Sequence, residues 1–379
     1  MLRSLRPSTL VIGASAMLAL PAAFAAERIQ VIASFSILAD MVENIGGEHV
    51  DVMSLVGPDS DTHVYSPSPG DARALADADL VVFNGLRFEG WMERLIDSSD
   101  YAGPRVVASE GVDKLDYHGH AADQAHGHDD TPDEHGHDDH GHGHDDDDHG
   151  HDDDDHGHDE HGDEGHDDHD HGDQDPHAWQ DLAMAQVYVV NIRDGLIEAD
   201  PANEPTYNEN AERYINEIEA TEEEIRELLT EIPASTSMIT GHDSFGYFSN
   251  AYGLRFLSPV GLSSEAEPSA ADMARLIDVI REQNVQALFH ENMTSPAIIN
   301  QLAEETGLPV AGTLYADALA AEGEASTYLG MMRHNAKTLH DALAEPGHDD
   351  HGDDDDDHGH SHGHGHGHGH GHDDHGHSH

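Results

Sequence analysis

The sequence predicts an α/β protein of two lobes, each a parallel β-sheet made of (β/α) units, with a long rigid helix joining the lobes. Three observations predict this fold class. Short runs rich in Val, Ile and Leu alternate with helical segments on both sides of residue 205, which is typical of buried parallel strands. One amphipathic stretch separates the two groups of runs. Two tracts of His, Asp and Gly interrupt the alternation without belonging to it.

The N-terminus has the pattern of a secretory signal peptide over residues 1–25. Arg3 and Arg6 precede the apolar run "TLVIGASAMLALPAAF", which is followed by the Ala-Phe-Ala of a cleavage site. The mature chain is expected to begin near Ala26. The apolar run is too short to favour a permanent membrane span. We therefore expect a soluble, exported protein.

The composition restricts the compartment and the partners. The chain has no cysteine, so disulfides, thiolate metal sites and a lipid-attached cysteine are excluded, which favours the periplasm of a double-membraned bacterium. The formal net charge is −62, and outside residues 118–175 and 348–379 the chain still has 45 acidic against 16 basic side chains. Such a field attracts cations and repels nucleic acid and anionic lipid. A salt-adapted surface is an equally good explanation of this excess.

The N-terminal lobe is expected to cover residues 26–204. Its strands are predicted in "IQVIASF", "VDVMSLV", "LVVFNG" and "RVVAS", with helices that open at Ser36 and Ser68, over "GWMERLID" and over "LAMAQVYVVNI". The tract at 118–173 has too few apolar residues to offset the entropy of ordering, so it is predicted to be a disordered insert when no metal is bound.

The linking helix is expected over residues 205–232. Tyr and Ile residues recur at helical spacing in "PTYNENAERYINEIEATEEEIRELLTEIP", with Pro205 near the start and Pro233 beyond the end. A helix of about 25 residues is roughly 37 Å long. A stiff connector of that length limits hinge motion between the lobes.

The C-terminal lobe is expected over residues 233–346. Strands are predicted in "SMIT", "LRFLSPV", "VQALFHE" and "PVAGTLY", and helices near Ser269, Ser295 and Thr327. The His-rich tail, 347–379, resembles the insert in composition and is also predicted to be disordered.

Four polar residues form the candidate site. Of 37 histidines, 17 lie in the insert and 13 in the tail, which leaves seven. Ligands of open α/β sheets bind beyond the carboxyl ends of strands. His63 in "SDTHVYSPSP", His242 in "TGHDSFGYF" and Asp317 in "LYADAL" each follow a predicted strand. His177 in "DPHAWQD" lies just beyond the insert, at the start of a helix, and belongs with them.

Three imidazoles and one carboxylate suit Zn²⁺, which takes four N or O ligands tetrahedrally. Imidazole also binds Cu²⁺ and Ni²⁺, whereas more carboxylates would have suggested Mn²⁺. His290 also follows a strand, with Glu291 beside it, and it competes for a place in the site. Asp181 and Asp243 are candidate acceptors for the imidazole N–H groups.

Several other residues near the site have simpler explanations. The three remaining histidines, His49, His334 and His340, are interpreted as ordinary helix or loop residues. Five aromatic residues could line the site and lower its dielectric constant, although most are expected to be core: Tyr65, Trp179, Phe245, Tyr247 and Phe248.

The motifs "THVYSPSP", "DPHAWQD", "GHDSFGYFSNAYGL", "GLSSEAEPSAADMARLI" and "LYADAL…STYLGMMRHN", in this order around a His-rich insert, resemble the ZnuA-like receptors of zinc ABC importers. Within that family they are most similar to the AztC-like group. The resemblance covers residues 27–345. It implies the periplasmic binding protein fold of metal receptors, with one Zn²⁺ held in an interlobe cleft and delivered to a membrane permease.

Carried over position by position, the resemblance implies the ligands His63, His177, His242 and Asp317. Related manganese receptors have a carboxylate at the position of His242, so the histidine favours zinc. The long His-rich tail departs from the family, which usually has one His-rich loop.

The expected function is therefore zinc capture for an ABC permease, without enzymatic activity. The tracts are expected to collect zinc weakly, although they could be plain solvated spacers. Two other functions stay open: a periplasmic zinc buffer or metallochaperone that acts without a permease, and a zinc hydrolase with Glu291 as its general base. A periplasmic zinc chaperone is a further candidate partner, and the protein is expected to be a monomer that binds no nucleic acid.

Overall fold

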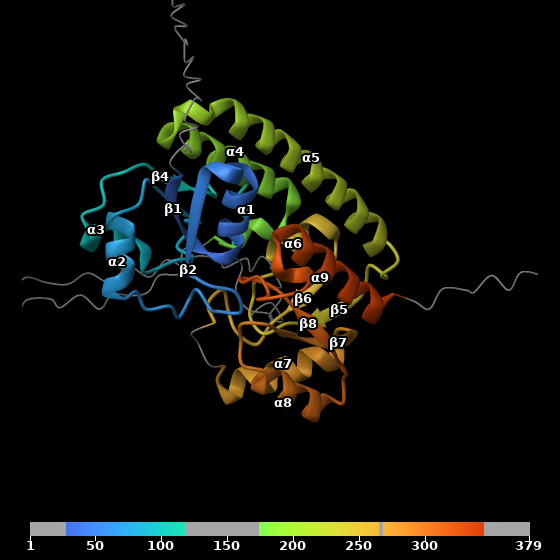
Figure 1. Cartoon of the computed structure of the whole chain (residues 1–379). Helices are drawn as coiled ribbons and strands as arrows, with labels where there is room; N and C mark the ends of the chain where they lie inside the picture. Colours follow the sequence, from blue (N-terminus) through green and yellow to red (C-terminus); the bar gives the residue numbers. More distant parts are fainter. Residues whose placement is uncertain (1–27, 118–173, 265–267, 345–379) are drawn as a thin grey trace, which may run out of the picture. The chain divides into compact units, whose positions relative to one another are not determined.

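The computed structural model describes residues 28–117, 174–264 and 268–344, which all belong to one compact unit (Figure 1). The predicted signal peptide, the His-rich insert and the His-rich tail lie outside the described residues. No helix within the described ranges is long and apolar enough to cross a membrane.

The N-terminal sheet has four parallel strands in the order β2-β1-β3-β4. The strands are β1 Ile29–Phe35, β2 Val50–Val56, β3 Leu80–Phe83 and β4 Arg105–Val107. The connecting helices are α1 Ser36–Gly46, α2 Pro69–Ala76 and α3 Met92–Ser99, with the 3-10 turn η1 at Gly47–His49. The predicted (β/α) order is thus confirmed in this half.

Local sequence explains these elements. Residues 31–35 of the inner strand β1 are all buried, as expected for a parallel strand covered on both faces. Helix α2 begins where Ser68 and Asp71 form a capping box and Pro69 occupies the first turn, where a missing N–H costs nothing. This cap ends the loop of residues 57–68 that follows β2.

Helices α4 Leu182–Ala199 and α5 Glu204–Leu229 lie side by side (Figure 1). The 3-10 turns η2 Ala178–Gln180 and η3 Pro201–Asn203 precede them. Helix α5 has 26 residues and is therefore about 39 Å long. Its buried side chains recur at helical spacing and pack against α1, α4 and the last helix, α9 Tyr328–Leu343. The predicted long helix is thus packed along much of its length.

The C-terminal sheet repeats the topology in the order β6-β5-β7-β8, all parallel. The strands are β5 Ser237–Ile239, β6 Arg255–Leu257, β7 Val285–Glu291 and β8 Val310–Leu314. The helices are α6 Gly246–Tyr252, α7 Ala270–Glu282 and α8 Ala297–Thr306, with the 3-10 turn η4 at Glu324–Ser326. Two parallel sheets and a long helix confirm the predicted fold class.

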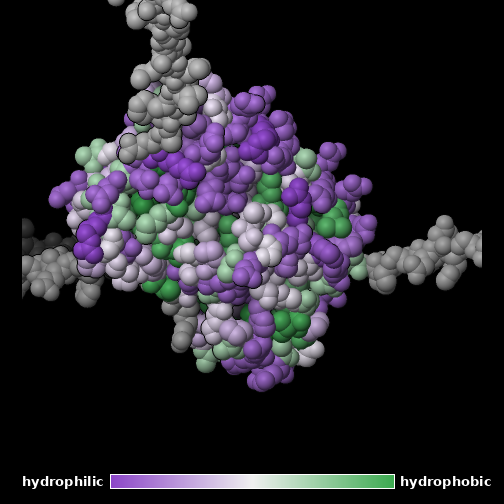
Figure 2. All heavy atoms as spheres, viewed as in Figure 1, coloured by the Kyte–Doolittle hydropathy of each residue, from purple (hydrophilic) through white to green (hydrophobic). Residues whose placement is uncertain are grey.

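Both sheets contribute to one large hydrophobic core, and the C-terminal sheet has a second, smaller core on its other face. Helices α7 and α8 cover one face of the C-terminal sheet with a small separate core that includes Leu288 (Figure 1). The next residue along β7, Phe289, points to the opposite face and belongs to the large core that also contains Val31 and Tyr214. A continuous packed interior therefore connects the halves, while hydrophilic side chains dominate the face seen in Figure 2.

Gly195→Ala is expected to destabilise the protein, although alanine normally improves a helix by about 1 kcal/mol. A Cβ at Gly195 of α4 would collide with the side chain of Val106 on β4. Overpacking of this kind costs about 1–3 kcal/mol, and urea unfolding measures it. The double variant with Val106→Ala should recover part of the loss. Equal or greater stability of Gly195→Ala would contradict this packing.

Candidate metal centre

The structure brings the four sequence-predicted residues together. His63 follows β2, His242 follows β5, Asp317 follows β8, and His177 directly precedes η2. One potential ligand atom of each lies within 4.8 Å of all the others. The Asp317 carboxylate is central: Oδ2 lies 3.0 Å from His242 Nε2 and 3.2 Å from His63 Nε2, and Oδ1 lies 3.6 Å from His177 Nε2.

Burial of these groups makes them unusual. His177, His242 and Asp317 are buried, whereas the His63 side chain keeps 7 % exposure. Nε2 of His63, Nε2 of His177 and Oδ1 of Asp317 have no hydrogen-bond partner although they are buried. An unpaired buried polar atom costs about 1–3 kcal/mol. A metal ion satisfies several such atoms at once, so the residues fit a bound cation.

Two further carboxylates orient the imidazoles. Asp175 Oδ1 lies 2.7 Å from His177 Nδ1 and accepts the His177 backbone N–H at 2.9 Å. Glu291 Oε2 lies 2.5 Å from His242 Nδ1, and Oε1 accepts the His242 backbone N–H at 3.0 Å. Because an ionised carboxylate only accepts, each Nδ1 carries the proton. In the neutral ring, the Nε2 lone pair then points at the centre.

The sequence predicts Asp181 and Asp243 as acceptors for the imidazole N–H groups. This prediction is wrong for His177 and His242, whose Nδ1 atoms bond Asp175 and Glu291. Asp181 caps α4 by accepting from the Ala183 N–H at 2.8 Å, and its carboxylate is used there. Asp243 lies beside the centre, where burial and then the charge of Asp175 raise its pKa to about 6. The sequence signal for Asp175 was present in "DPHAWQD", two residues before His177.

The other described histidines lie elsewhere. His290 Nε2 pairs with Asn300 Oδ1 of α8 at 3.0 Å, so its ring points to the outer face of the sheet. Each of the remaining three has its own neighbour: His49 lies against the ring of Tyr207, His334 against the Thr313 carbonyl and His340 against Glu231.

Aromatic rings pack against the centre. Phe88, which sequence patterns did not indicate, lies 4.8 Å from the His63 ring and 5.8 Å from the His177 ring, measured between centroids. Trp179 lies 5.4 Å from the His177 ring. The other four aromatic candidates contact residues outside the four-residue cluster: Tyr65 packs on Trp91, Phe245 and Phe248 on Phe256, and Tyr247 bonds the Asp113 carbonyl. Phe88 and Trp179 thus lower the local dielectric constant.

The charges of the centre oppose one another. Burial lowers the pKa of His242, but the charges of Glu291 and Asp317 outweigh it and raise that pKa well above its ordinary value. Burial raises the pKa of Asp317, but the charges of His242 and His177 outweigh it and hold that pKa well below its ordinary value. For His63, burial dominates and lowers the pKa. Without metal, His242 is therefore a protonated partner of Asp317.

The loop with Asp317 is fixed from both sides. The carbonyl of Ala316 accepts from Trp179 Nε1 at 2.9 Å and from Gln180 Nε2 at 2.8 Å. Asn335 of α9 bonds both the N–H and the carbonyl of Tyr315, at 2.9 and 2.7 Å. These bonds hold the backbone of the two residues that precede Asp317.

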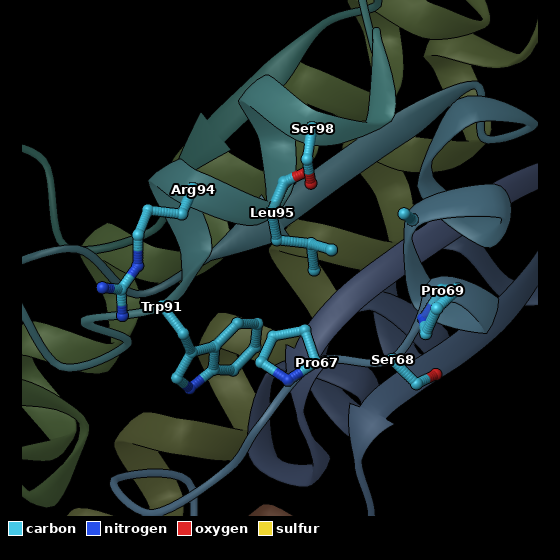
Figure 3. A pocket seen from close by; sticks show the side chains of 8 residues that line it. Pro67, Ser68, Pro69, Trp91, Arg94, Leu95 and Ser98 are labelled. Carbon is cyan, nitrogen blue, oxygen red and sulfur yellow. The ribbon is translucent and has the colours of Figure 1, made fainter.

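A groove of about 410 Å³ lies near this centre but does not include its residues (Figure 3). It is lined by Pro67, Ser68, Pro69, Ala72, Trp91, Arg94, Leu95 and Ser98. Trp91 connects the groove to the centre, because its Nε1 donates to the Thr62 carbonyl at 2.9 Å, one residue before His63.

Together, the fold and the centre define a class of protein: a two-lobed parallel α/β protein that brings potential metal ligands together on loops from both sheets.

Comparison with known proteins identifies the family. The family described as "Zinc-uptake complex component A periplasmic" matches residues 31–342, and the chain belongs to this family. The chain is 29% identical over 321 residues to the manganese-binding lipoprotein MntA of Halalkalibacterium halodurans, covering 84% of this chain and 90% of that protein. It is 28% identical to the iron-binding protein YfeA of Yersinia pestis over 323 residues, 83% of this chain and 86% of that one. The predicted family is thus confirmed.

A solved structure has the same fold. The periplasmic zinc-binding protein TroA from Treponema pallidum superposes with a TM-score of 0.68 at 24% identity, over 84% of this chain and all of that chain. The relatives together carry manganese, iron and zinc in their names, so the metal of this chain has to be argued from its own ligands.

Binding of a divalent metal ion is expected to release a proton at about pH 7.5, because the raised pKa keeps His242 protonated above the ordinary imidazole value of about 6.5. The affinity for the metal should therefore decrease as the pH falls, and this decrease should begin above pH 6.5, the ordinary pKa of imidazole. Calorimetry in buffers of different ionisation heat measures the release. Glu291→Gln removes the larger of the two charges that raise the pKa of His242, so this variant should release fewer protons when it binds the metal. A metal that binds wild type without proton release would contradict this assignment.

Proposed function

We propose that the protein captures Zn²⁺ with His63, His177, His242 and Asp317 and delivers it to the membrane permease of an ABC transporter. The observation that carries the proposal is the convergence of three imidazoles, two of them buried, on one buried carboxylate. Membership of a metal-uptake family supports the transport role.

The donor set is the argument for zinc. Three imidazole nitrogens and one carboxylate provide the four N or O ligands of a tetrahedral Zn²⁺ site. Mn²⁺ prefers carboxylate, carbonyl and water oxygens. The carboxylates that contact these imidazoles besides Asp317, those of Asp175 and Glu291, are already bonded to imidazole Nδ1 atoms. Cu²⁺ and Ni²⁺ also bind imidazole, so metal analysis has to include them.

The proposed role of the His-rich insert is weak collection of zinc beside the centre. The described residues at its two ends meet: Asp116 and Gln174 form an antiparallel bridge, and the Asp175 N–H donates to the Leu115 carbonyl at 2.9 Å. Asp175 is also the residue that bonds His177. The insert therefore starts and ends next to a proposed ligand, which supports a role in raising the local metal concentration.

The proposed compartment is the periplasm, supported by the signal-peptide pattern and by the family's description. We propose a monomeric receptor rather than an enzyme. A hydrolytic zinc site needs a general base near an open coordination position, and the predicted base, Glu291, uses both carboxylate oxygens to hold His242. The two remaining alternatives are a zinc buffer that acts without a permease and a receptor that a zinc chaperone loads. They differ from this proposal only in the partner protein.

Substitution of His63, His177 or His242 by Ala is expected to abolish tight zinc binding, because each change removes one of four bonds to the ion. Chelator competition on protein purified without added metal measures this loss, and metal analysis identifies the ion. His290→Ala is the matched control, since its ring pairs with Asn300. An unchanged competition curve for any of the first three variants would remove that residue from the site.

Deletion of residues 118–173 together with 347–379 is expected to leave one tight zinc site with nearly the same affinity, because the four ligands lie outside both segments. A set of weaker sites should disappear, and in the full chain these should weaken from about pH 7 to 5 as free imidazole is protonated. Calorimetric titration compares the two proteins. Equal stoichiometry would mean that the tracts do not collect zinc, and loss of the tight site would mean that they supply ligands.

A further inference from the structure

We propose that Asp59 is a positioning residue that controls metal release, because it fastens the loop with His63 to the loop with Asp317. The inference rests on the proposed function of the four-residue centre. Asp59 does not contact the centre; it acts through the two loops, residues 57–68 and 315–321.

Three hydrogen bonds of Asp59 connect the two loops, and we call this set of bonds the clasp. The Asp59 N–H donates to the Leu319 carbonyl at 2.9 Å. The Asp59 carboxylate accepts the Ala321 N–H at 3.0 Å and Asn292 Nδ2 at 2.9 Å. Asn292 directly follows Glu291, which holds His242. One side chain of the N-terminal half thus bonds the loops that follow β7 and β8 in the C-terminal half.

A second carboxylate in the same loop strengthens the contact. Asp61 Oδ1 accepts the His63 backbone N–H at 2.9 Å, and Oδ2 accepts from Ser264 Oγ at 2.5 Å. The position of His63 therefore depends on bonds to the other half of the protein. On the groove side, its loop is held by the bond from Trp91 to the Thr62 carbonyl.

The loop that carries His63 can open more easily than the segments that carry the other three proposed ligands. His177 and His242 are buried and each is held by a carboxylate, and Asp317 is held by the bonds to Ala316 and Tyr315. His63 is the one ligand with residual exposure, and Asp59 itself is exposed. Hydrogen bonds of an exposed side chain compete with water, so the clasp can open without breaking the core.

The backbone at Asp59 permits a clean test. Asp59 has φ 53°, in the left-handed region that glycine adopts without strain. Asp59→Gly therefore removes both accepting oxygens and keeps the backbone. Asp100 offers the matched control, because it is also exposed, has φ 58° and ends α3 away from the clasp.

The experiment measures the rate at which zinc-loaded full-length protein transfers Zn²⁺ to an excess of a chromogenic chelator in a stopped-flow instrument. Asp59→Gly is expected to accelerate release about tenfold, equivalent to about 1.4 kcal/mol. Asp100→Gly should stay close to wild type. Asp59→Asn, which keeps one accepting oxygen, should give an intermediate rate.

The visible spectrum of bound Co²⁺ should be the same in wild type and Asp59→Gly, because the ligands are unchanged. An altered spectrum would mean that Asp59 shapes the centre itself, and this result would overturn the inference. Equal rates for wild type and Asp59→Gly would also overturn it, as would equal acceleration by Asp100→Gly. A wild-type protein that retains no zinc would overturn the proposed function as well.

Discussion

The buried carboxylate of Asp317 among three imidazoles is the interaction on which the rest of the structure depends. A charge removed from water is costly unless it is paired, and Asp317 has no lysine or arginine partner among its described contacts. Its compensation is the positive charge of a protonated His242, which a bound cation would replace. For the metal site that we propose, this means that a proton leaves when the ion binds, which couples the affinity to pH.

Orientation of the imidazoles requires charges outside the cluster. Asp175 and Glu291 each hold one histidine through both its ring Nδ1 and its backbone N–H. Such double contacts fix the side chain and the loop together, so the Nε2 atoms stay directed at Asp317. Phe88 and Trp179 exclude water around these rings, which strengthens every charge interaction inside.

The shared core limits how the two halves can move. Helix α5 packs on α1, α4 and α9, and the large hydrophobic cluster extends from β1 to residues of β7 and α9 without interruption. Separation of the halves as rigid bodies would expose much of this apolar surface. The loops around the centre are joined by a few exposed hydrogen bonds and can open at far lower cost. Under the proposed function, metal exchange is therefore expected to be a local event at the loop that carries His63.

The alternation of apolar runs, the long helix and the four candidate residues were all readable in the sequence, because each is a local pattern. A strand followed by a polar residue places that residue at the carboxyl edge of its sheet, whatever the rest of the chain does. Only the tertiary structure decided that Glu291 serves His242, since the two are 49 residues apart, and that Asp181 is used by a helix cap instead. The packing of Phe88 on His63 and the reach of Asp59 to Asn292 likewise depend on segments that meet only after both sheets have formed, so no local pattern encodes them.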